Sequence, residues 1–363
     1  MDITFTNSKG GTIMKRVIHL LTTDKYSGAE NVAIQIVNHI NMRYTDVECY
    51  YVSPKGDIEN ILVSYNCKYS LIDKFSYFHL RKLNTRLEPD IIHAHDFIAS
   101  VMATICFPGK KIISHLHNNA PWIQKKGIFS FIYYCASARI TKILTVSEAI
   151  ENEYVYAKKL KDKFECIGNP IDTMSILDKA KEYSVQQQFD LIFLGRLTKA
   201  KNPDLLRRVF IKAIEKKKSI KIAIVGDGEY YQEFEHWIEQ NRLGTNIKMY
   251  GFQENPYPIL KNSKVLVLPS KWEGFGLVSI EALTLGKPVV CSDAGGLKKI
   301  VTKDCGYVIE NENVDQYVSE ILELVNDENY YERKHNAALD RAKDLNNIDQ
   351  YIEQVYREYE IEG

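Results

Sequence analysis

The chain has 363 residues, more than one hydrophobic core of roughly 250 to 300 residues serves, so two domains are expected. Its composition, 45% hydrophobic and 26% charged, is that of a globular protein and excludes a disordered chain. The formal net charge of zero removes any global electrostatic basis for binding nucleic acid.

Cysteine usage and hydropathy point to a cytoplasmic protein. Seven scattered cysteines without a CxxC pair indicate a reducing compartment. No apolar stretch reaches the roughly 18 residues of a membrane span, and the N-terminus is too polar for a signal peptide. Residues 1–14 show no periodicity, and we expect them to form a flexible extension.

Strand-like and helix-like runs alternate through the first half of the chain. Strands are predicted at residues 15–22, 47–52, 69–73, 90–95, 111–117, 142–147 and 164–169, and helices at 29–40, 97–106 and 148–155. This alternation is typical of βαβ units in a parallel sheet. It predicts a first α/β domain over residues 15–172.

A second series of alternating elements follows a polar stretch without a strand at residues 173–188, which we interpret as a linker. Strands are predicted at 190–195, 220–226, 247–251, 265–270 and 288–293, and helices at 202–216, 230–241 and 277–286. The second domain therefore spans residues 189–345. Residues 346–363 form a helix with one apolar face, which is expected to pack back on the first domain.

The predicted fold class is thus α/β, with two doubly wound parallel-sheet domains. Such sheets bind ligands outside the carboxyl ends of their strands. Arg196 and Lys201 lie there, in the loop after the strand at 190–195. Two cations at this place suit a diphosphate. The alternative is a solvated basic loop, since most loop cations face water.

The stretch EGFGLVSIE connects a buried strand to a helix, with Glu273 before the helix and Glu281 eight residues later within it. The glycines on either side of Phe275 let backbone N–H groups approach a ligand at the start of the helix, where anions are favoured. Glu281 could accept hydrogen bonds from two vicinal hydroxyls, as a ribose presents, and Glu273 would point beyond the phosphates. The alternative is an exposed Glu273 and a Glu281 on the polar face of the helix.

Several ordered motifs together resemble glycosyltransferase family four. The resemblance rests on SGAE (27–30), DIIHAHD (90–96), SHLHN (114–118), TVSEAI (145–150), GNPID (168–172), GRLTKAKNP (195–203), EGFGLVSIE (273–281) and GKPVVCSDAGG (286–296). It implies a GT-B architecture, in which two Rossmann-like domains face a cleft and the C-terminal domain holds a nucleotide-sugar donor. It also implies transfer with retention of anomeric configuration, without a cofactor or an obligatory metal.

The resemblance also implies roles for residues of the second domain. Arg196 and Lys201 would hold the donor diphosphate, Glu281 the ribose hydroxyls and Glu273 the donor sugar. The remaining donor-binding positions are Gly274, Phe275, Gly276 and Leu277, near the distal phosphate or sugar, and Phe252, whose loop would help select sugar and base.

In the first domain the resemblance points to Gly28, which would approach the diphosphate, and to His117, which matches the cleft histidine of the family. A hydrogen bond from His117 to a sugar hydroxyl would position the ring. We expect His115 to face the opposite side of its strand in a structural role, and we assign no role to His93 or His95.

The resemblance implies a glycan or lipid-linked acceptor, a UDP-sugar donor and a setting in bacterial surface polysaccharide assembly. Aromatic residues interleaved with Lys125 and Lys126 suit peripheral contact with the inner membrane surface. The alternative is that these aromatics, among them Trp122, Phe129 and Phe131, belong to helices that cover the sheet.

Other function classes fit the sequence less well. An oxidoreductase is disfavoured because the first strand is not followed by GxGxxG. A nucleotide-sugar epimerase and a noncatalytic sugar-nucleotide-binding partner of another transferase remain alternatives. The combination of Arg196, Lys201, Glu273 and Glu281 favours a transferase over both.

Overall fold

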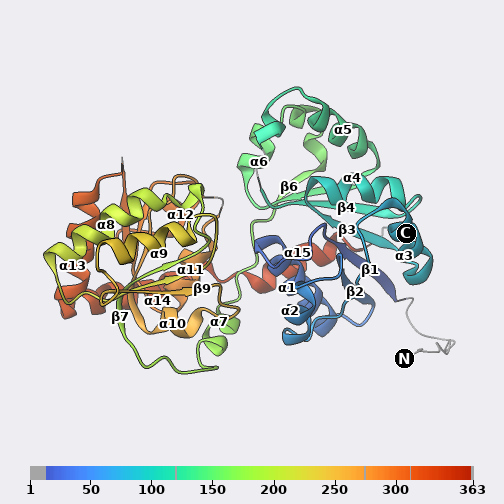
Figure 1. Ribbon diagram of the computed structural model, residues 1–363. Coiled ribbons are helices and arrows are strands. Elements are labelled where there is room, and N and C mark those ends of the chain that lie inside the picture. Colours follow the sequence, from blue (N-terminus) through green and yellow to red (C-terminus); the bar gives the residue numbers. More distant parts are fainter. Residues whose placement is uncertain (1–13, 119–120, 274, 311, 361–363) are drawn as a thin grey trace. The chain divides into compact units, whose positions relative to one another are not determined.

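The computed structural model describes residues 14–118, 121–273, 275–310 and 312–360 (Figure 1). The chain forms two compact units, Met1–Pro170 with Asp349–Gly363 and Ile171–Ile348. The predicted extension at 1–14 lies outside the described residues except for Met14, which is exposed.

The first unit contains a parallel sheet of six strands among the described residues, in the order β2-β1-β3-β4-β5-β6. The strands are β1 (Lys15–Leu20), β2 (Val47–Val52), β3 (Ile91–His95), β4 (Lys111–Leu116), β5 (Lys142–Thr145) and β6 (Phe164–Cys166). The strand predicted at 69–73 is wrong, because this segment makes only isolated bridges, Tyr51↔Tyr69 and Pro54↔Ile72.

Parallel strands require crossover connections, and helices supply most of them here. The helices of this unit are α1 (Gly28–Arg43), α2 (Ile58–Ser64), α3 (Tyr77–Leu87), α4 (Asp96–Cys106), α5 (Ile128–Ala136), α6 (Glu148–Glu153) and, after the second unit, α15 (Ile348–Arg357). Short 3-10 turns are η1 (Pro121–Gln124), η2 (Ser137–Arg139), η3 (Ala157–Lys159) and η4 (Lys161–Lys163).

Side chains alternate between the two faces of this sheet. Ile18, Leu20, Ile92 and Ala94 join a core cluster with residues of α3, α4, α5 and α6. The residues between them therefore point to the opposite face. His19 lies there with Tyr359, a residue that follows α15.

The second unit also has a six-stranded parallel sheet within the described residues, in the order β12-β11-β10-β7-β8-β9. Its strands are β7 (Phe189–Leu194), β8 (Ile222–Val225), β9 (Ile247–Gly251), β10 (Ser263–Leu268), β11 (Val289–Ser292) and β12 (Gly306–Ile309). The strands are buried on both faces, as expected for a parallel sheet covered by helices.

Helices cover both faces of this second sheet. They are α7 (Thr173–Lys179), α8 (Pro203–Lys216), α9 (Tyr231–Gln240), α10 (Tyr257–Lys261), α11 (Leu277–Thr284), α12 (Leu297–Ile300), α13 (Val314–Asn326) and α14 (Glu328–Leu345), with the turn η5 (Lys199–Lys201). One face packs on α7, α10, α11 and α14, and the other on α8, α9 and α13.

The linker predicted at 173–188 lies within this second unit. Ile176 and Ala180 are buried in the same core cluster as Ile280 of α11, so this stretch is packed structure. Leu177 and Val185 pack against the same cluster, and the polar residues between these apolar positions made the stretch resemble a linker.

The chain returns to the first unit at Asp349, and the segment with α15 is fixed there by several contacts. Arg43, at the end of α1, forms an ion pair with Asp349 at 2.5 Å, and Tyr44 stacks on Tyr356 with ring centroids 3.6 Å apart. Lys15 donates to the carbonyl oxygen of Tyr359 at 3.3 Å. The last described residues are therefore an integral layer of the first unit.

Both strand orders reverse direction at a defined point. In the first sheet β1 lies between β2 and β3, and in the second β7 lies between β8 and β10. A crevice opens where connections leave to opposite sides of a doubly wound sheet. The loops after β1 and β3, and those after β7 and β10, are therefore the places for ligand-binding residues.

Candidate active site

The switch point of the second sheet brings together residues far apart in the sequence. β7 and β10 are neighbours, with Leu191 opposite Val265 and Ile192 opposite Leu266. The loop after β7 carries Arg196 and Lys201, and the loop after β10 carries Glu273. A backbone hydrogen bond of 2.8 Å from Lys271 to the carbonyl oxygen of Ala200 joins the two loops.

Lys201 and Glu273 form an ion pair, in which the Lys201 ammonium donates to the Glu273 carboxylate. The Ser270 hydroxyl donates to the same carboxylate oxygen at 3.1 Å. The side chains of Lys201 and Glu273 are 17% and 15% exposed, so the ion pair is screened from bulk water but reachable by a ligand. Two residues with separate predicted roles therefore hold each other in place.

Arg196 differs from Lys201 in being exposed, and it forms no ion pair with a residue that the structure describes. Its exposed guanidinium adds a positive charge to the loop that also carries Lys201. A planar donor of this kind suits bidentate binding of a phosphate group.

The loop before α11 is fixed by a glycine in the left-handed region. Gly276 has φ 89°, and a Cβ at this position would lie 2.8 Å from Leu297 Cδ2. The amides of Phe275 and Gly276 donate to no residue in the described ranges, while Phe275 itself packs partly on the core. Leu277 begins α11, as predicted, and Gly274 lies outside the described residues.

Glu281 lies on α11, where the Tyr257 hydroxyl donates to its Oε1 at 3.2 Å. Burial raises the pKa of Glu281 to about 7, against the opposing effects of Tyr257, Lys179 and Lys201. The carboxyl group is therefore divided between its neutral and charged forms at physiological pH. Phe252, after β9, is 60% exposed and belongs to neither of the two core clusters of this unit that the described residues form.

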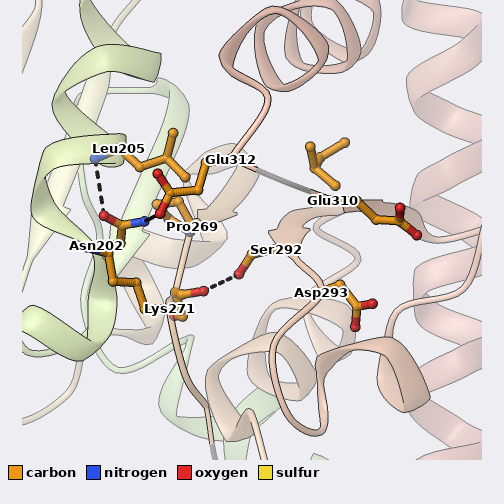
Figure 2. A pocket seen from close by; sticks show the side chains of 10 residues that line it. Asn202, Leu205, Pro269, Lys271, Ser292, Asp293, Glu310 and Glu312 are labelled. Carbon is orange, nitrogen blue, oxygen red and sulfur yellow. Dashed lines mark hydrogen bonds between the residues drawn. The ribbon is translucent and has the colours of Figure 1, made fainter.

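A pocket of about 510 Å³ lies at the ends of β10, β11 and β12 in the same unit (Figure 2). Asn202 donates to Glu312 at 2.8 Å inside it, and Ser292 donates to the carbonyl oxygen of Ser270. Its lining is Asn202, Leu205, Pro269, Ser270, Lys271, Ser292, Asp293, Ile309, Glu310 and Glu312. Three carboxylates against one lysine disfavour a diphosphate, and none of the predicted site residues lines the pocket.

In the first unit, Gly28 is the first residue of α1, directly after the β1 loop. Its backbone is not in the left-handed region, and a Cβ placed on it would meet nothing within 4 Å. The fold itself therefore does not require glycine here. A ligand that approaches the backbone closely would supply the reason.

His117 directly follows β4, and its backbone N–H donates to Asp96 Oδ1 at 2.9 Å. Asp96 opens α4 with φ 66°, and burial raises the pKa of its carboxyl group to about 6. Burial lowers the pKa of His117 to about 3, so its imidazole is neutral. His117 is therefore a hydrogen-bonding group rather than a cation.

His117 is part of a cluster that the sequence analysis missed. The expectation that His115 faces away from it is wrong, because residues two apart on a strand share a face. The two rings stack with centroids 4.2 Å apart. His19, His93 and His95 lie on the same face, and the repeated HxH pattern was the signal that could have revealed the cluster.

Two groups of histidines in the described ranges bring possible ligand nitrogens within 4.8 Å of one another, His19/His93/His95 and His95/His115/His117. These nitrogens are also hydrogen-bonded to each other, for example His95 Nδ1 to His117 Nε2 at 2.8 Å. Within the described residues these hydrogen bonds join the five rings to one another and to Tyr359, and His115 Nε2 is left without a partner.

Comparisons with known proteins identify the family of the chain. The family described as "Glycosyltransferase Family 4" matches residues 26–174, and that described as "Glycosyl transferases group 1" matches residues 176–341. An uncharacterized glycosyltransferase of Methanocaldococcus jannaschii is 30% identical over 248 residues, 66% of each chain. The chain thus spans about two thirds of the length of this relative.

Other similarities extend over more of the chain. The Escherichia coli UDP-Gal:alpha-D-GlcNAc-diphosphoundecaprenol alpha-1,3-galactosyltransferase is 24% identical over 341 residues, 86% of this chain and 88% of that protein. Anabaena HepE, solved in complex with UDP and glucose, superposes with a TM-score of 0.78 at 19% identity. That superposition covers 95% of this chain and 98% of HepE.

Proposed function

Because the chain belongs to glycosyltransferase family four and has the GT-B fold, we propose that it transfers a sugar from UDP to a hydroxyl group of a glycan or lipid-linked acceptor. The observation that carries this proposal is the ion pair of Lys201 with Glu273 at the switch point of the second sheet, where the loop after β7 also carries the exposed Arg196. UDP is favoured because the E. coli relative is named for a UDP-sugar donor, and HepE was solved with UDP. The diphosphoundecaprenol acceptor in the name of the same relative supports a role in surface polysaccharide assembly.

The two cations stabilise the leaving group. As the bond between the anomeric carbon and the diphosphate oxygen breaks, negative charge grows on the diphosphate, and Arg196 and Lys201 neutralise it. Preorganised cations do this with little reorganisation. They also take the place of a divalent metal, so we propose that the reaction needs none.

Glu273 positions the donor sugar instead of attacking it. Lys201 and Ser270 both donate to Oε2 of its carboxylate, which leaves Oε1 able to accept a hydrogen bond from a sugar hydroxyl. We propose a front-face reaction: the acceptor oxygen bonds to the anomeric carbon on the side from which the diphosphate leaves. The acceptor proton passes to the departing diphosphate oxygen, and the configuration is retained.

Glu281 and the loop before α11 hold the nucleotide. The Glu281 carboxylate accepts hydrogen bonds from the two ribose hydroxyls. The backbone N–H groups of Phe275 and Gly276 donate hydrogen bonds to the distal phosphate or sugar. Phe252 offers an exposed aromatic face near the end of β9 for the base. We also propose that Gly28 lets a diphosphate approach its backbone, since a Cβ at this position would meet nothing within 4 Å in the fold.

We propose that helix α5 of the first unit helps to reach the acceptor, because one of its faces is apolar and exposed. Tyr133 of α5 is buried in the core of the first unit, while the outward positions Ile128, Phe129, Phe131 and Ile132 are 70%, 64%, 52% and 42% exposed. The neighbouring Lys125 and Lys126 are exposed as well. Apolar side chains beside lysines suit a surface with anionic lipid, so this face would bring the enzyme to a lipid-linked acceptor. No helix in the described residues is long and apolar enough to cross a bilayer.

Vesicle flotation tests the membrane contact. We expect the protein to float with vesicles containing anionic lipid and a double Phe129→Ser, Phe131→Ser variant to remain at the bottom. Met42→Ser, at a comparably exposed position on α1, is the matched control and should behave as the native chain does. Equal flotation of the native and double-variant proteins would remove the contact from the proposal.

Thermal unfolding with a panel of nucleotides, with a chelator present, tests the donor site. Ligands that bind only the folded protein raise its melting temperature by mass action. We expect UDP and one UDP-sugar to stabilise the protein, and Arg196→Ala or Lys201→Ala to abolish this effect. Lys199→Ala, in the same loop and exposed, is the matched control.

A second measurement separates an enzyme from a noncatalytic binding partner. A labelled UDP-sugar incubated with the protein and a lipid-linked glycan acceptor should release UDP and label the acceptor. Stabilisation by UDP-sugar without turnover would support the noncatalytic alternative, and absence of any nucleotide effect would refute the donor site.

A further inference from the structure

The histidine cluster of the first unit forms one unbranched chain of hydrogen bonds. From its outer end, His117 Nε2 lies 2.8 Å from His95 Nδ1, and His95 Nε2 lies 3.0 Å from His19 Nδ1. The Tyr359 hydroxyl lies 3.0 Å from His19 Nε2 and 2.7 Å from His93 Nδ1. His93 Nε2 in turn lies 3.2 Å from His115 Nδ1, where the chain ends.

The inner residues of this hydrogen-bond chain are buried in the first unit. Its five inner members, His19, His93, His95, His115 and Tyr359, are at most 2% exposed. Burial lowers the pKa of His19 to about 3 and that of His93, His95 and His115 well below the ordinary value. Each ring is therefore neutral at physiological pH and carries a single N–H.

One proton per ring forces all the links to run in the same direction. A neutral imidazole that bonds through both nitrogens donates from one and accepts at the other. The Tyr359 hydroxyl has one proton, so it donates to one of His19 and His93 and accepts from the other. If it accepted from both, its buried O–H would have no partner. Only two arrangements remain, with every ring protonated on Nδ1 or every ring protonated on Nε2.

The surroundings of His115, at the inner end of the hydrogen-bond chain, favour one of these two arrangements. His115 Nε2 is buried and has no hydrogen-bond partner among the described residues. A proton on that nitrogen would be an orphaned buried donor, which native structures avoid more strictly than an unpaired acceptor. His115 therefore carries its proton on Nδ1 and donates to His93, and every following link runs outward to His117.

We propose that His19, His93, His95, His115 and Tyr359 are positioning residues that fix His117 as the Nδ1–H tautomer, with its Nε2 accepting from His95. This inference rests on the proposed transferase function for its consequence: His117 is a hydrogen-bond donor to a hydroxyl of the donor sugar. It does not act as a general base, because its unprotonated nitrogen already accepts a hydrogen bond inside the protein.

Nitrogen NMR of the full-length protein labelled with 15N-histidine tests the tautomers without any ligand. We expect the five signals of the chain, assigned by single His→Gln variants, to report neutral rings protonated on Nδ1. Any of the five protonated on Nε2, or charged at neutral pH, would overturn the proposal. So would a change of these signals on adding one equivalent of Zn²⁺, because the cluster would then be a metal site.

Two variants of His95 test the effect on His117. His95→Leu removes the donor to His117 Nε2, whereas the amide of His95→Asn can replace Nδ1–H. We expect His95→Leu to give mixed tautomers of His117 and a kcat about tenfold lower at little-changed KM, and His95→Asn to restore both. Equal kcat in the native and His95→Leu proteins would overturn the role in positioning.

These readouts keep the two proposals separate. If UDP fails to stabilise a protein whose five rings are protonated on Nδ1, the proposed function fails and the hydrogen-bond chain stands. Should His95→Leu not fold, the tautomers of the native protein still decide whether the chain runs as proposed.

Discussion

Glu281 gives a prediction that links stability to pH. Burial raises its pKa from the ordinary 4.5 to about 7, so the folded protein binds a proton that the unfolded chain has released. The contribution of Glu281 to the free energy of unfolding is therefore fully present below pH 4.5 and is lost as the pH rises to 7. At 1.36 kcal/mol per pKa unit, the loss amounts to roughly 3 kcal/mol above pH 7.

The variant Glu281→Gln removes this cost, since a neutral amide can still accept from the Tyr257 hydroxyl. We expect equal melting temperatures of the two proteins near pH 4.5. At pH 8 the transition of the second unit should be higher by about 6–12 °C in Glu281→Gln, from about 2–4 °C per kcal/mol for a unit of this size. The variant should also lose affinity for UDP, because it cannot offer a carboxylate to the ribose.

Thermal unfolding of both proteins from pH 4.5 to 8 is the assay, with Glu254→Gln, an exposed glutamate of the same unit, as the control. A difference that does not depend on pH, or a native protein more stable than Glu281→Gln at pH 8, would refute the reasoning. Either result would mean that the carboxyl group is better solvated than its surroundings indicate.

The other predictions concern a cation and two glycines. Lys201→Ala should lower turnover at saturating donor by roughly a thousandfold because the leaving diphosphate loses a preorganised cation, and near-normal turnover would contradict its proposed role. Gly276→Ala should destabilise the second unit by about 1–3 kcal/mol, since its φ of 89° and the contact with Leu297 exclude a side chain; unchanged denaturant unfolding would argue against this. Gly28→Ala should unfold as the native protein does, because a Cβ there has open space, yet raise KM for the donor. An unchanged KM would remove Gly28 from the site.

The fold could be predicted well from the sequence because its signal is local. Buried parallel strands read as continuous apolar runs, and the runs that end at Leu194 and Leu268 are β7 and β10. The segment at 173–188 was misinterpreted because its few apolar residues, which pack on the core, are scattered among polar ones. The bridges made by Tyr69 and Ile72 could not be told from a strand by composition.

The sequence predicted on which loops and helices the candidate residues lie, but not the contacts that they make. The positions of Arg196, Lys201 and Glu281 follow from loops and helix starts that the pattern already indicates. The ion pair of Lys201 with Glu273 joins residues 72 positions apart and depends on which strands are neighbours. The pKa of Glu281 depends on the depth of burial, which a sequence does not specify.

The histidine chain was missed for two reasons. His115 was assigned to the wrong face of its strand, which separated it from His117. Tyr359 lies 266 positions from His93, and nothing in the sequence of a C-terminal helix indicates a hydroxyl placed between two imidazoles.

The return of the chain at Asp349 has a consequence for synthesis on the ribosome. Domains usually fold from the N-terminus as they emerge, at about 5–20 residues per second. Here the first unit waits for Tyr359, which follows Pro170 after the entire second unit, a delay on the order of 10–40 seconds at that rate. During this time His19 and His93 lack the hydroxyl that joins them, so the hydrogen bonds of the first unit are completed only after the second unit has been synthesised.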